Sequence, residues 1–207
     1  IYGKTKQFPI KETNITNPIT VYGSGKLAGE HYTNSYHQCY GLDTTVLRIF
    51  NNYGPRAHYE GDCGEVIPRS IINIFHKKPP VIFGDGSITR DFFYVKDTAK
   101  VLTSLMNYNE LTGETYNLGT GNEISMKNLL EMILKLIPGH KLRIQYLSSR
   151  PADVPRLWVD AGKLKSIVNF KSEMQFEKGI KITIDYYKHL MKEKKLTEKI
   201  PLMNWEK

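Results

Sequence analysis

Residues 22–56 read YGSGKLAGEHYTNSYHQCYGLDTTVLRIFNNYGPR, and this stretch decides the fold class. Its first half has apolar residues at three- to four-residue spacing, which predicts a helix from Gly23 to Tyr40 that Gly41 would end. Residues 44–50 (TTVLRIF) predict a buried strand, and the Gly-, Pro- and Asn-rich residues 51–64 predict a loop. A helix that leads into a buried strand is one unit of an alternating α/β fold.

The same alternation continues on the C-terminal side of this stretch, while residues 1–21 have no periodic apolar face and predict a long loop. A turn at residues 84–86 should be followed by a loop through Arg90 and Asp91. Ser125 is placed to cap a helix. We therefore expect an α/β protein with much of its sheet parallel. The further helices are predicted over residues 65–77, 96–107, 125–137 and 177–195, and the further strands over residues 81–83, 115–118 and 142–147.

Composition excludes several classes of protein. With 207 residues, 40% of them hydrophobic and 11% aromatic, the chain can form a core, so disorder throughout is excluded. No apolar run approaches the roughly 18 residues that a membrane span needs. The formal net charge is +8, and 22 of the 29 basic residues are Lys. Solvated surface lysines explain this basic excess, and the alternative explanation is an anionic partner.

The cysteines and the first residues of the sequence bear on the cellular compartment that we expect for this protein. Cys39 and Cys63 have neither metal-ligand spacing nor the numbers of a disulfide framework, which favours a reducing, cytoplasmic setting. The sequence opens with IYG and no basic and then apolar leader, so a signal peptide is not expected, and the sequon at residues 14–16 is expected to be unused. The aromatic residues do not alternate with a basic patch, so a nucleic-acid-binding module is disfavoured.

Residues 23–26 (GSGK) are similar to the end of a phosphate-binding P-loop, but they fail its pattern. A P-loop needs Gly five residues before its last Gly and Ser or Thr after the Lys. This chain has Thr20 and Leu27 at those two positions. We therefore exclude a P-loop.

Tyr22 and Lys26 form a more informative pair, because residues four apart at the start of a helix lie on one face. A phenol with an ordinary pKa near 10 is a poor base at neutral pH. A fixed ammonium nearby favours the phenolate and makes such a group able to take a proton from an alcohol. One such pair is expected by chance in a chain of this length, so the pair needs further support.

Seven spaced segments supply that support: residues 1–3 (IYG), 22–30 (YGSGKLAGE), 47–56 (LRIFNNYGPR), 66–68 (VIP), 83–97 (FGDGSITRDFFYVKD), 116–121 (YNLGTG) and 150–154 (RPADV). In this order they resemble the extended short-chain dehydrogenase/reductases that modify nucleotide sugars, the epimerase/dehydratase group. The resemblance covers residue 1 to about residue 188. The family has Ser directly before the motif Lys, where this chain has Gly25.

The resemblance implies the C-terminal part of an NAD-binding Rossmann-like fold plus a smaller mixed α/β domain that binds the nucleotide sugar. Residues 1–60 would be the remainder of the cofactor-binding domain. Residues 61–207 would be mainly the substrate-binding domain, with residues 92–107 packing back on the Rossmann sheet. The helix that bears Tyr22 and the one near Glu65 would pair across a two-fold axis in a homodimer.

The resemblance also assigns roles to single residues. Tyr22 would be the catalytic acid/base, and Lys26 would hold the nicotinamide ribose of NAD and favour the phenolate. Phe50 would also contact the cofactor, and no metal is implied. The residues expected to bind the nucleotide-diphosphate sugar are Asn51 at the sugar or its phosphate, Arg90 and Arg150 at the diphosphate, Asp153 at the ribose hydroxyls, and Val66, Val81 and Phe83 around the base.

Some of these residues also have simpler interpretations. Phe83 could belong to the core, and Asp91 and Asp97 could cap or pair locally. The Gly-rich turn that receives the NAD pyrophosphate does not occur in this sequence. We expect the chain to be part of a protein of roughly 310 to 340 residues.

The residues that name the reaction would lie before Ile1, among them the catalytic Ser or Thr and the acidic pair of dehydratases. A UDP-sugar 4-epimerase is favoured, with a 4,6-dehydratase and a UDP-glucuronate decarboxylase as alternatives. A non-catalytic fragment that binds nucleotide sugars is the alternative from another class.

Overall fold

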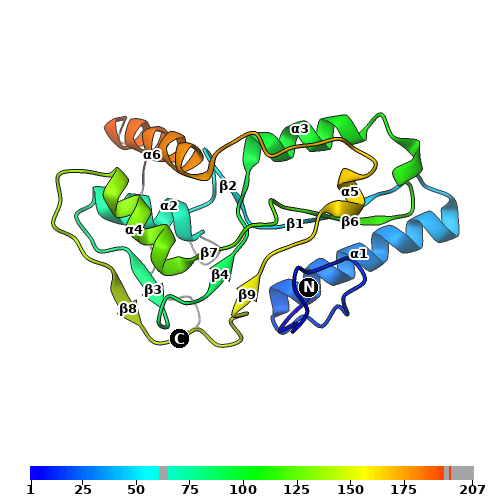
Figure 1. Ribbon diagram of the computed structural model, residues 1–207, viewed down its shortest axis with the longest axis horizontal. Helices are drawn as coiled ribbons and strands as arrows, with labels where there is room; N and C mark the ends of the chain where they lie inside the picture. Colours follow the sequence, from blue (N-terminus) through cyan, green and yellow to red (C-terminus); the bar gives the residue numbers. More distant parts are fainter. Residues whose placement is uncertain (61–64, 194–195, 197–207) are drawn as a thin grey trace. The chain divides into compact units, whose positions relative to one another are not determined.

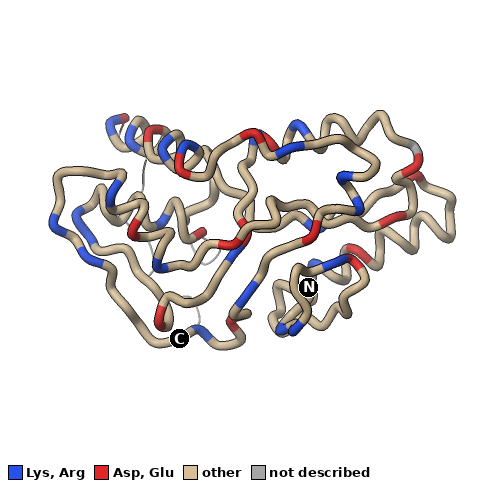
Figure 2. Tube along the Cα trace, viewed as in Figure 1, with Lys and Arg blue, Asp and Glu red and all other residues tan. Residues whose placement is uncertain are grey.

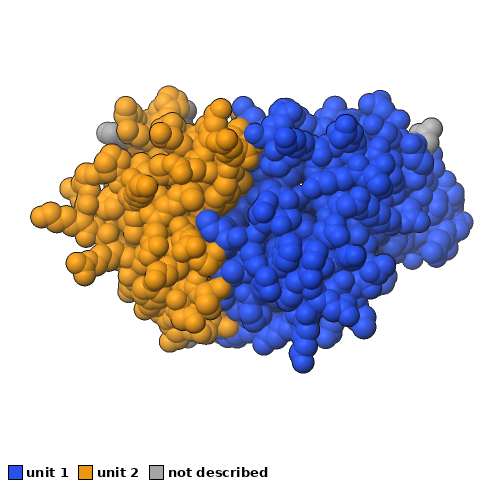
Figure 3. Space-filling view, viewed as in Figure 1, with its two compact units in different colours: residues 1–51, 88–124, 151–173 blue, residues 52–87, 125–150, 174–207 orange. Residues whose placement is uncertain are grey.

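The computed structural model of this protein describes residues 1–60, 65–193 and 196 (Figure 1). Cys63 and Lys195 lie outside the described residues. The chain forms two compact units, each built from three separate segments (Figure 3). Unit 1 consists of residues 1–51, 88–124 and 151–173, and unit 2 of the described residues within 52–87, 125–150 and 174–207. The assignment of residues 1–60 to a cofactor-binding domain and of residues 61–207 mainly to a substrate-binding domain stays a prediction.

Unit 1 contains the stretch from which the fold class was predicted. Helix α1 (Val21–Tyr40) begins where the Thr20 side chain accepts a hydrogen bond from the Gly23 amide and ends at Gly41, which adopts a left-handed conformation with φ 65°. Strand β1 (Val46–Ile49) pairs in parallel with β6 (Thr115–Leu118). The predicted helix, its end at Gly41, and the two strands are confirmed.

Apolar residues of unit 1 form a core next to β6, with α3 (Val95–Leu105), the 3-10 helix η1 (Asn109–Leu111) and α5 (Gly162–Lys165) contributing side chains. Its buried members are Phe93, Val101, Leu111, Tyr116, Leu118, Leu164 and Val168. A second cluster buries Tyr2, Ile10, Phe50 and Val159. Ile10 makes a single parallel bridge to Val159, and the rest of residues 1–20 is irregular as predicted.

The predicted loop through Arg90 is wrong in part, because Arg90 lies in a short strand. Strand β4 (Thr89–Arg90) pairs in parallel with β9 (Arg156–Leu157). A two-residue strand has no hydrophobic period, so spacing cannot reveal it. For the same reason the sequence did not predict β2 (Asn52–Tyr53), β5 (Phe93–Tyr94), β7 (Ile124–Ser125) and the four-residue α5.

In unit 2, three amphipathic helices pack against one another: α2 (Val66–Phe75), α4 (Met126–Leu136) and α6 (Phe176–Lys192). The Ser125 side chain caps α4 by accepting from the Asn128 amide, as predicted. Strand β3 (Val81–Phe83) pairs in parallel with β8 (Gln145–Leu147), which is shorter than the strand predicted over residues 142–147. The side chains buried from these helices include Ile67, Ile71, Ile72, Leu129, Leu130, Ile133, Ile180 and Ile184.

Charges on α6 are mixed. Lysines and acidic residues follow one another along this helix (Figure 2), and His189 lies 3.2 Å from Glu193. Helix α6 therefore does not present a uniformly basic surface. Within residues 1–60, 65–193 and 196, no helix combines the length and the apolar character that crossing a membrane requires.

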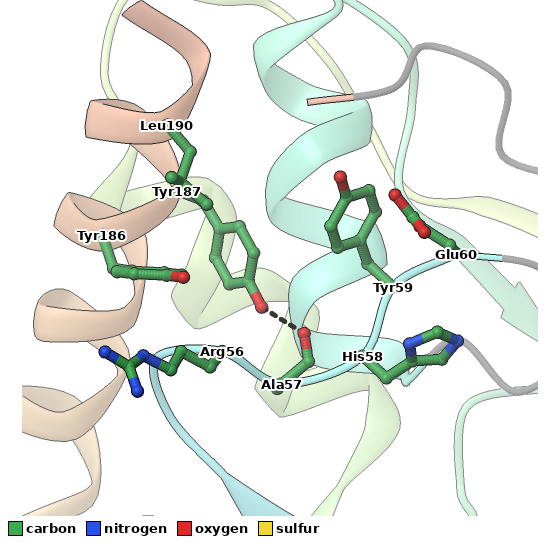
Figure 4. A pocket seen from close by; sticks show the side chains of 8 residues that line it. All are labelled: Arg56, Ala57, His58, Tyr59, Glu60, Tyr186, Tyr187 and Leu190. Atoms are coloured by element: carbon green, nitrogen blue, oxygen red, sulfur yellow. Dashed lines mark hydrogen bonds between the residues drawn. The ribbon is translucent and has the colours of Figure 1, made fainter. Parts of the chain in front are cut away.

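Tyrosines hold residues 52–60 against α6. The Tyr53 hydroxyl donates to the Phe176 carbonyl, and a Cβ at Gly179 would lie 2.3 Å from that hydroxyl oxygen. Further along, the buried Tyr187 hydroxyl donates to the Ala57 carbonyl (Figure 4). Tyr59 packs edge-on against the Tyr187 ring at a centroid distance of 5.9 Å. A shallow cavity of about 240 Å³ lies between this loop and α6.

The Tyr187 contact predicts a pH-dependent stability. Burial, followed by nearby Tyr186, raises the pKa of Tyr187 above its ordinary value of 10.0. The contribution of Tyr187 is therefore fully present below pH 10.0 and is lost as the pH rises through the higher pKa of the folded state. Tyr187→Phe should lower the free energy of unfolding by about 1 kcal/mol at neutral pH. The difference from wild type should shrink above about pH 10 in urea titrations.

Tyr186→Phe is the matched control, because it changes the adjacent residue of α6 and keeps the ring that packs at 5.1 Å on Tyr187. We expect it to stay within about 0.5 kcal/mol of wild type. A gap between Tyr187→Phe and wild type that widens with alkali would contradict this assignment.

Candidate functional site

Tyr22 and Lys26 lie one turn apart at the start of α1. The Lys26 ammonium nitrogen is 5.4 Å from the centroid of the Tyr22 ring, so the two side chains share one face of the helix. The Tyr22 side chain is open to solvent, with 74% of the residue exposed. A Cβ at Gly25 would have no neighbour within 4 Å, so the Ser that the family has at this position would also fit. The predicted pairing of Tyr22 with Lys26 is confirmed as geometry, while their catalytic roles stay predictions.

A buried ion pair attaches α1 to the sheet of unit 1. Arg48 on β1 contacts Glu30 on α1 with distances of 2.9 Å from Nε to Oε2 and 2.5 Å from Nη2 to Oε1. The two side chains are only 10% and 9% exposed. Arg48 Nη1 also donates to the Tyr2 hydroxyl, which in turn donates to Asn117 on β6. This network sets the position of the helix that carries Tyr22 and Lys26.

The electrostatics of this network favour the charged guanidinium. Burial alone would lower the pKa of Arg48, but hydrogen bonds to Glu30 and Tyr2 outweigh it and raise that pKa. For Tyr2, burial raises the pKa although Arg48 and Asn117 act in the opposite direction. Arg48 and Glu30 therefore form a charged pair whose members depend on each other.

Asn51 lies two residues after the end of β1 and is held by Asp91. Its side-chain Nδ2 donates to the Asp91 carbonyl at 3.0 Å, and its own carbonyl accepts from the Phe93 amide at 3.2 Å. The backbone of Asn51 has φ 21°, a positive value that Asn tolerates better than most residues. The amide of Asn51 is thereby held in one orientation.

Arg90 and Asp153, both predicted to bind the nucleotide, contact each other in unit 1. Arg90 Nη2 lies 3.3 Å from Asp153 Oδ1, and Nη1 donates to the carbonyls of Thr89 and Val154 at 2.8 Å each. The two side chains are 16% and 27% exposed. The guanidinium is therefore fixed by the loop that precedes β9.

Arg150 and Phe83 form a second pair, which belongs to unit 2. The guanidinium carbon of Arg150 lies 4.3 Å from the centroid of the Phe83 ring, a stacked cation–π contact. Phe83 and Val81 are half-buried on β3, and Val66 is the half-buried first residue of α2. Phe83 is therefore not simply a core residue. That these residues surround a nucleotide base stays a prediction.

The structure thus brings the predicted residues together as pairs within each unit. Unit 1 joins Tyr22 with Lys26 and Arg90 with Asp153, and unit 2 joins Arg150 with Phe83. The convergence of these pairs on one substrate stays a prediction. The sequence suggested that Asp91 could cap or pair locally, whereas its carboxylate accepts hydrogen bonds from Thr120 and Gly121, which are 29 and 30 positions away in the chain. The sole sequence signal that could have singled out Asp91 is its place between Arg90 and the aromatic residues 92–94.

The residues present fit one end of a dinucleotide. Tyr22 and Lys26 are accessible and could hold a nicotinamide ribose, whereas Phe50 is buried with Tyr2 and Ile10, so its cofactor contact stays a prediction. Among the residues that the structure describes, no three His, Cys, Asp or Glu side chains gather as metal ligands.

Comparisons with known proteins agree over most of the chain. A sequence model of the GDP-mannose 4,6-dehydratase family matches residues 1–183. A putative UDP-glucose 4-epimerase of Methanocaldococcus jannaschii is 35% identical over 189 residues, which are 91% of this chain and 60% of that protein.

Solved structures are similar over the same part. The UDP-glucose 4-epimerase of Thermotoga maritima, determined with UDP-glucose, superposes with a TM-score of 0.86 and 31% identity over 92% of this chain and 60% of that one. A dTDP-glucose 4,6-dehydratase of Bacillus anthracis in complex with NAD has a TM-score of 0.82 and 27% identity over 92% and 60% of the two chains. This chain spans about 60% of the length of such relatives.

Proposed function

Because this chain belongs to the extended short-chain dehydrogenase/reductases, in their epimerase/dehydratase group, we propose that the complete protein uses NAD to modify a nucleotide-diphosphate sugar through a 4-keto intermediate. The observation that carries this proposal is the solvent-open face of α1, on which the Tyr22 phenol and the Lys26 ammonium lie together. A phenol beside an ammonium is suited to remove a proton from a sugar hydroxyl.

The chain's own residues would divide the work as follows. Tyr22, as phenolate, takes the proton of the sugar 4-hydroxyl and returns it later. Lys26 favours the negative charge of that phenolate and holds the nicotinamide ribose. The chemistry that NAD supplies when bound is the acceptance and return of a hydride at C4.

The arginines would hold the far end of the substrate. A guanidinium is a permanently charged, planar fork that matches diphosphate oxygens, which suits Arg90 and Arg150 to that group. Asp153 would bind the ribose hydroxyls, and Asn51 the sugar or its phosphate. Energy from these remote contacts would then position C4 near Tyr22.

Among the reactions of this group, a UDP-sugar 4-epimerase is the first choice. The similarity to the epimerases of M. jannaschii and T. maritima supports it. A 4,6-dehydratase, in which water is lost across C5 and C6, is the second choice and is supported by the family match and the B. anthracis relative. A UDP-glucuronate decarboxylase is third, and a non-catalytic module that binds nucleotide sugars is the alternative from another class.

We also propose a homodimer in a reducing, cytoplasmic setting. The outward side of α1 exposes Tyr32, Tyr36 and Tyr40 at 71%, 53% and 78%, which a second copy could cover. Cys39 on the same helix is an exposed free thiol, which suits a reducing compartment.

Product analysis of the complete protein tests the proposed activity. We expect UDP-glucose incubated with catalytic NAD to yield the C4 epimer, detected by proton NMR, while dTDP-glucose and UDP-glucuronate stay unchanged. A 4-keto-6-deoxy product from dTDP-glucose would assign the dehydratase instead. Binding of a nucleotide sugar without NAD binding or conversion would favour the non-catalytic class. If the complete protein neither binds a nucleotide sugar, nor binds NAD, nor converts a substrate, the proposal is overturned.

A further inference from the structure

Asp91 is a fully buried carboxylate that holds the turn after β6. Its Oδ1 accepts from the Thr120 amide at 3.0 Å and from the Thr120 hydroxyl at 2.5 Å, and its Oδ2 accepts from the Gly121 amide at 2.9 Å. The residue is 0% exposed. At Gly119 a Cβ would lie 2.9 Å from Asp91 Oδ2 and 2.3 Å from a Val159 methyl, so the close approach of this turn requires glycine.

The backbone of the same residue holds two other segments. Its amide donates to the Leu157 carbonyl of β9 at 2.9 Å, and its carbonyl accepts from Asn51 Nδ2 at 3.0 Å. Asp91 therefore connects three segments that are distant in sequence: the end of β1, the turn after β6, and β9. All three belong to unit 1.

Asp91 also lies beside two residues that the proposed function uses. The Asn51 side chain is oriented by the hydrogen bond that its Nδ2 donates to the Asp91 carbonyl, and Arg90 directly precedes Asp91 in the chain. The Arg90 guanidinium is fixed by Asp153 and Val154, which precede β9. Because the Asp91 amide donates to Leu157 of that same segment and Arg90 is its neighbour in the chain, a shift of the Asp91 backbone would disturb both the Asn51 amide and the Arg90 guanidinium.

Burial and hydrogen bonding act in opposite directions on the Asp91 carboxyl group. Burial raises the pKa of Asp91, although the hydrogen bonds from Thr120 and Gly121 act in the opposite direction. Because the pKa is raised in the folded state, ionised Asp91 contributes less stability at neutral pH than it would when protonated.

We propose that Asp91 is a positioning residue for the nucleotide-sugar site, where its carboxylate anchors the backbone that orients Asn51 and Arg90. This inference rests on the proposed function. The carboxylate does not touch substrate in this arrangement, because its oxygens face the amides of Thr120 and Gly121.

The test measures nucleotide binding by the complete protein, with UDP, dTDP and GDP as probes in isothermal titration calorimetry. Asp91→Asn keeps one oxygen for Thr120, removes the charge and places an amide donor against the Gly121 N–H. We expect it to fold and to weaken binding of the preferred diphosphate on the order of 10-fold or more, since a small misplacement of binding groups is costly. In assays, KM should rise more than kcat falls.

Asp97→Asn is the matched control. Asp97 is also buried in unit 1, but its carboxylate accepts from the Ser172 hydroxyl at 3.2 Å and from the Glu173 amide at 3.0 Å, and these partners belong to a different segment from the turn at Thr120. We expect its binding to stay within about twofold of wild type. Thr120→Val removes one donor to Asp91 and should weaken binding less than Asp91→Asn, and the double variant should be no weaker than Asp91→Asn alone.

The outcomes separate the two proposals. If wild type binds none of the three diphosphates, the proposed function fails, and this inference fails with it. If wild type binds and Asp91→Asn binds within twofold of Asp97→Asn, the positioning role alone is overturned. Should Asp91→Asn not fold, Thr120→Val decides, because unchanged binding in that variant also overturns the role.

Discussion

Replacing Tyr22 by phenylalanine in the complete protein should lower turnover about 100-fold or more, because general acid–base groups contribute 10² to 10⁴ in rate. The hydroxyl that would take the sugar proton is lost, while the ring and its 5.4 Å contact with the Lys26 ammonium can stay. Binding of the nucleotide diphosphate should change by no more than about twofold, since it depends on other residues. Steady-state kinetics and calorimetry measure the two effects separately.

Tyr32→Phe is the control for this substitution. Tyr32 lies on the same helix and is exposed to a similar extent, 71% against 74% for Tyr22. It has no role in the proposed chemistry, so turnover should stay at the wild-type level. Unchanged turnover in Tyr22→Phe would contradict the assignment of the acid/base, and an equal loss in both variants would indicate a general effect on α1.

Glu30→Ala should have the largest effect on stability, about 3 to 5 kcal/mol off the free energy of unfolding. The substitution leaves the Arg48 guanidinium, 10% exposed, without its carboxylate partner on α1. A buried charge that loses its partner cannot recover the solvation that it gave up on folding. Urea denaturation of wild type and variant, followed by circular dichroism, gives the difference.

Glu114→Ala is a matched control for an exposed ion pair. Glu114 lies 2.7 Å from the Lys163 ammonium, with side chains 55% and 40% exposed, so its loss should cost no more than about 1 kcal/mol. The double variant Glu30→Leu and Arg48→Met should recover part of the stability, because apolar residues of similar size can replace a buried pair. Equal effects of Glu30→Ala and Glu114→Ala would contradict the buried-pair argument.

Local signals were sufficient to predict the longer elements. The spacing of apolar residues predicted α1, α2, α4 and α6, and Gly41 and Ser125 marked where a helix ends or begins. These predictions succeed because helix periodicity and capping depend on neighbours within a few residues. The same locality explains why the Tyr22–Lys26 pair could be placed on one face from spacing alone.

Contacts between distant segments could not be predicted in this way. Arg90 was expected in a loop, but the amides of its neighbours Thr89 and Asp91 donate to the carbonyls of residues 155 and 157, which places Arg90 in β4. The pairing of Arg90 with Asp153 and the contact of Asp91 with Thr120 join residues 63 and 29 positions apart. Nothing in the local pattern distinguishes a buried acceptor such as Asp91 from a solvent-exposed cap.

The α/β class, the family and the shared face of Tyr22 and Lys26 could all be predicted from residue spacing and short motifs along the chain. The attachment of α1 through Arg48 and Glu30, and the three segments that Asp91 joins, became visible in the folded chain alone. The physical reason is that burial and hydrogen-bond partners arise when distant segments pack, and the same side chain is inexpensive in water but costly without a partner in the interior.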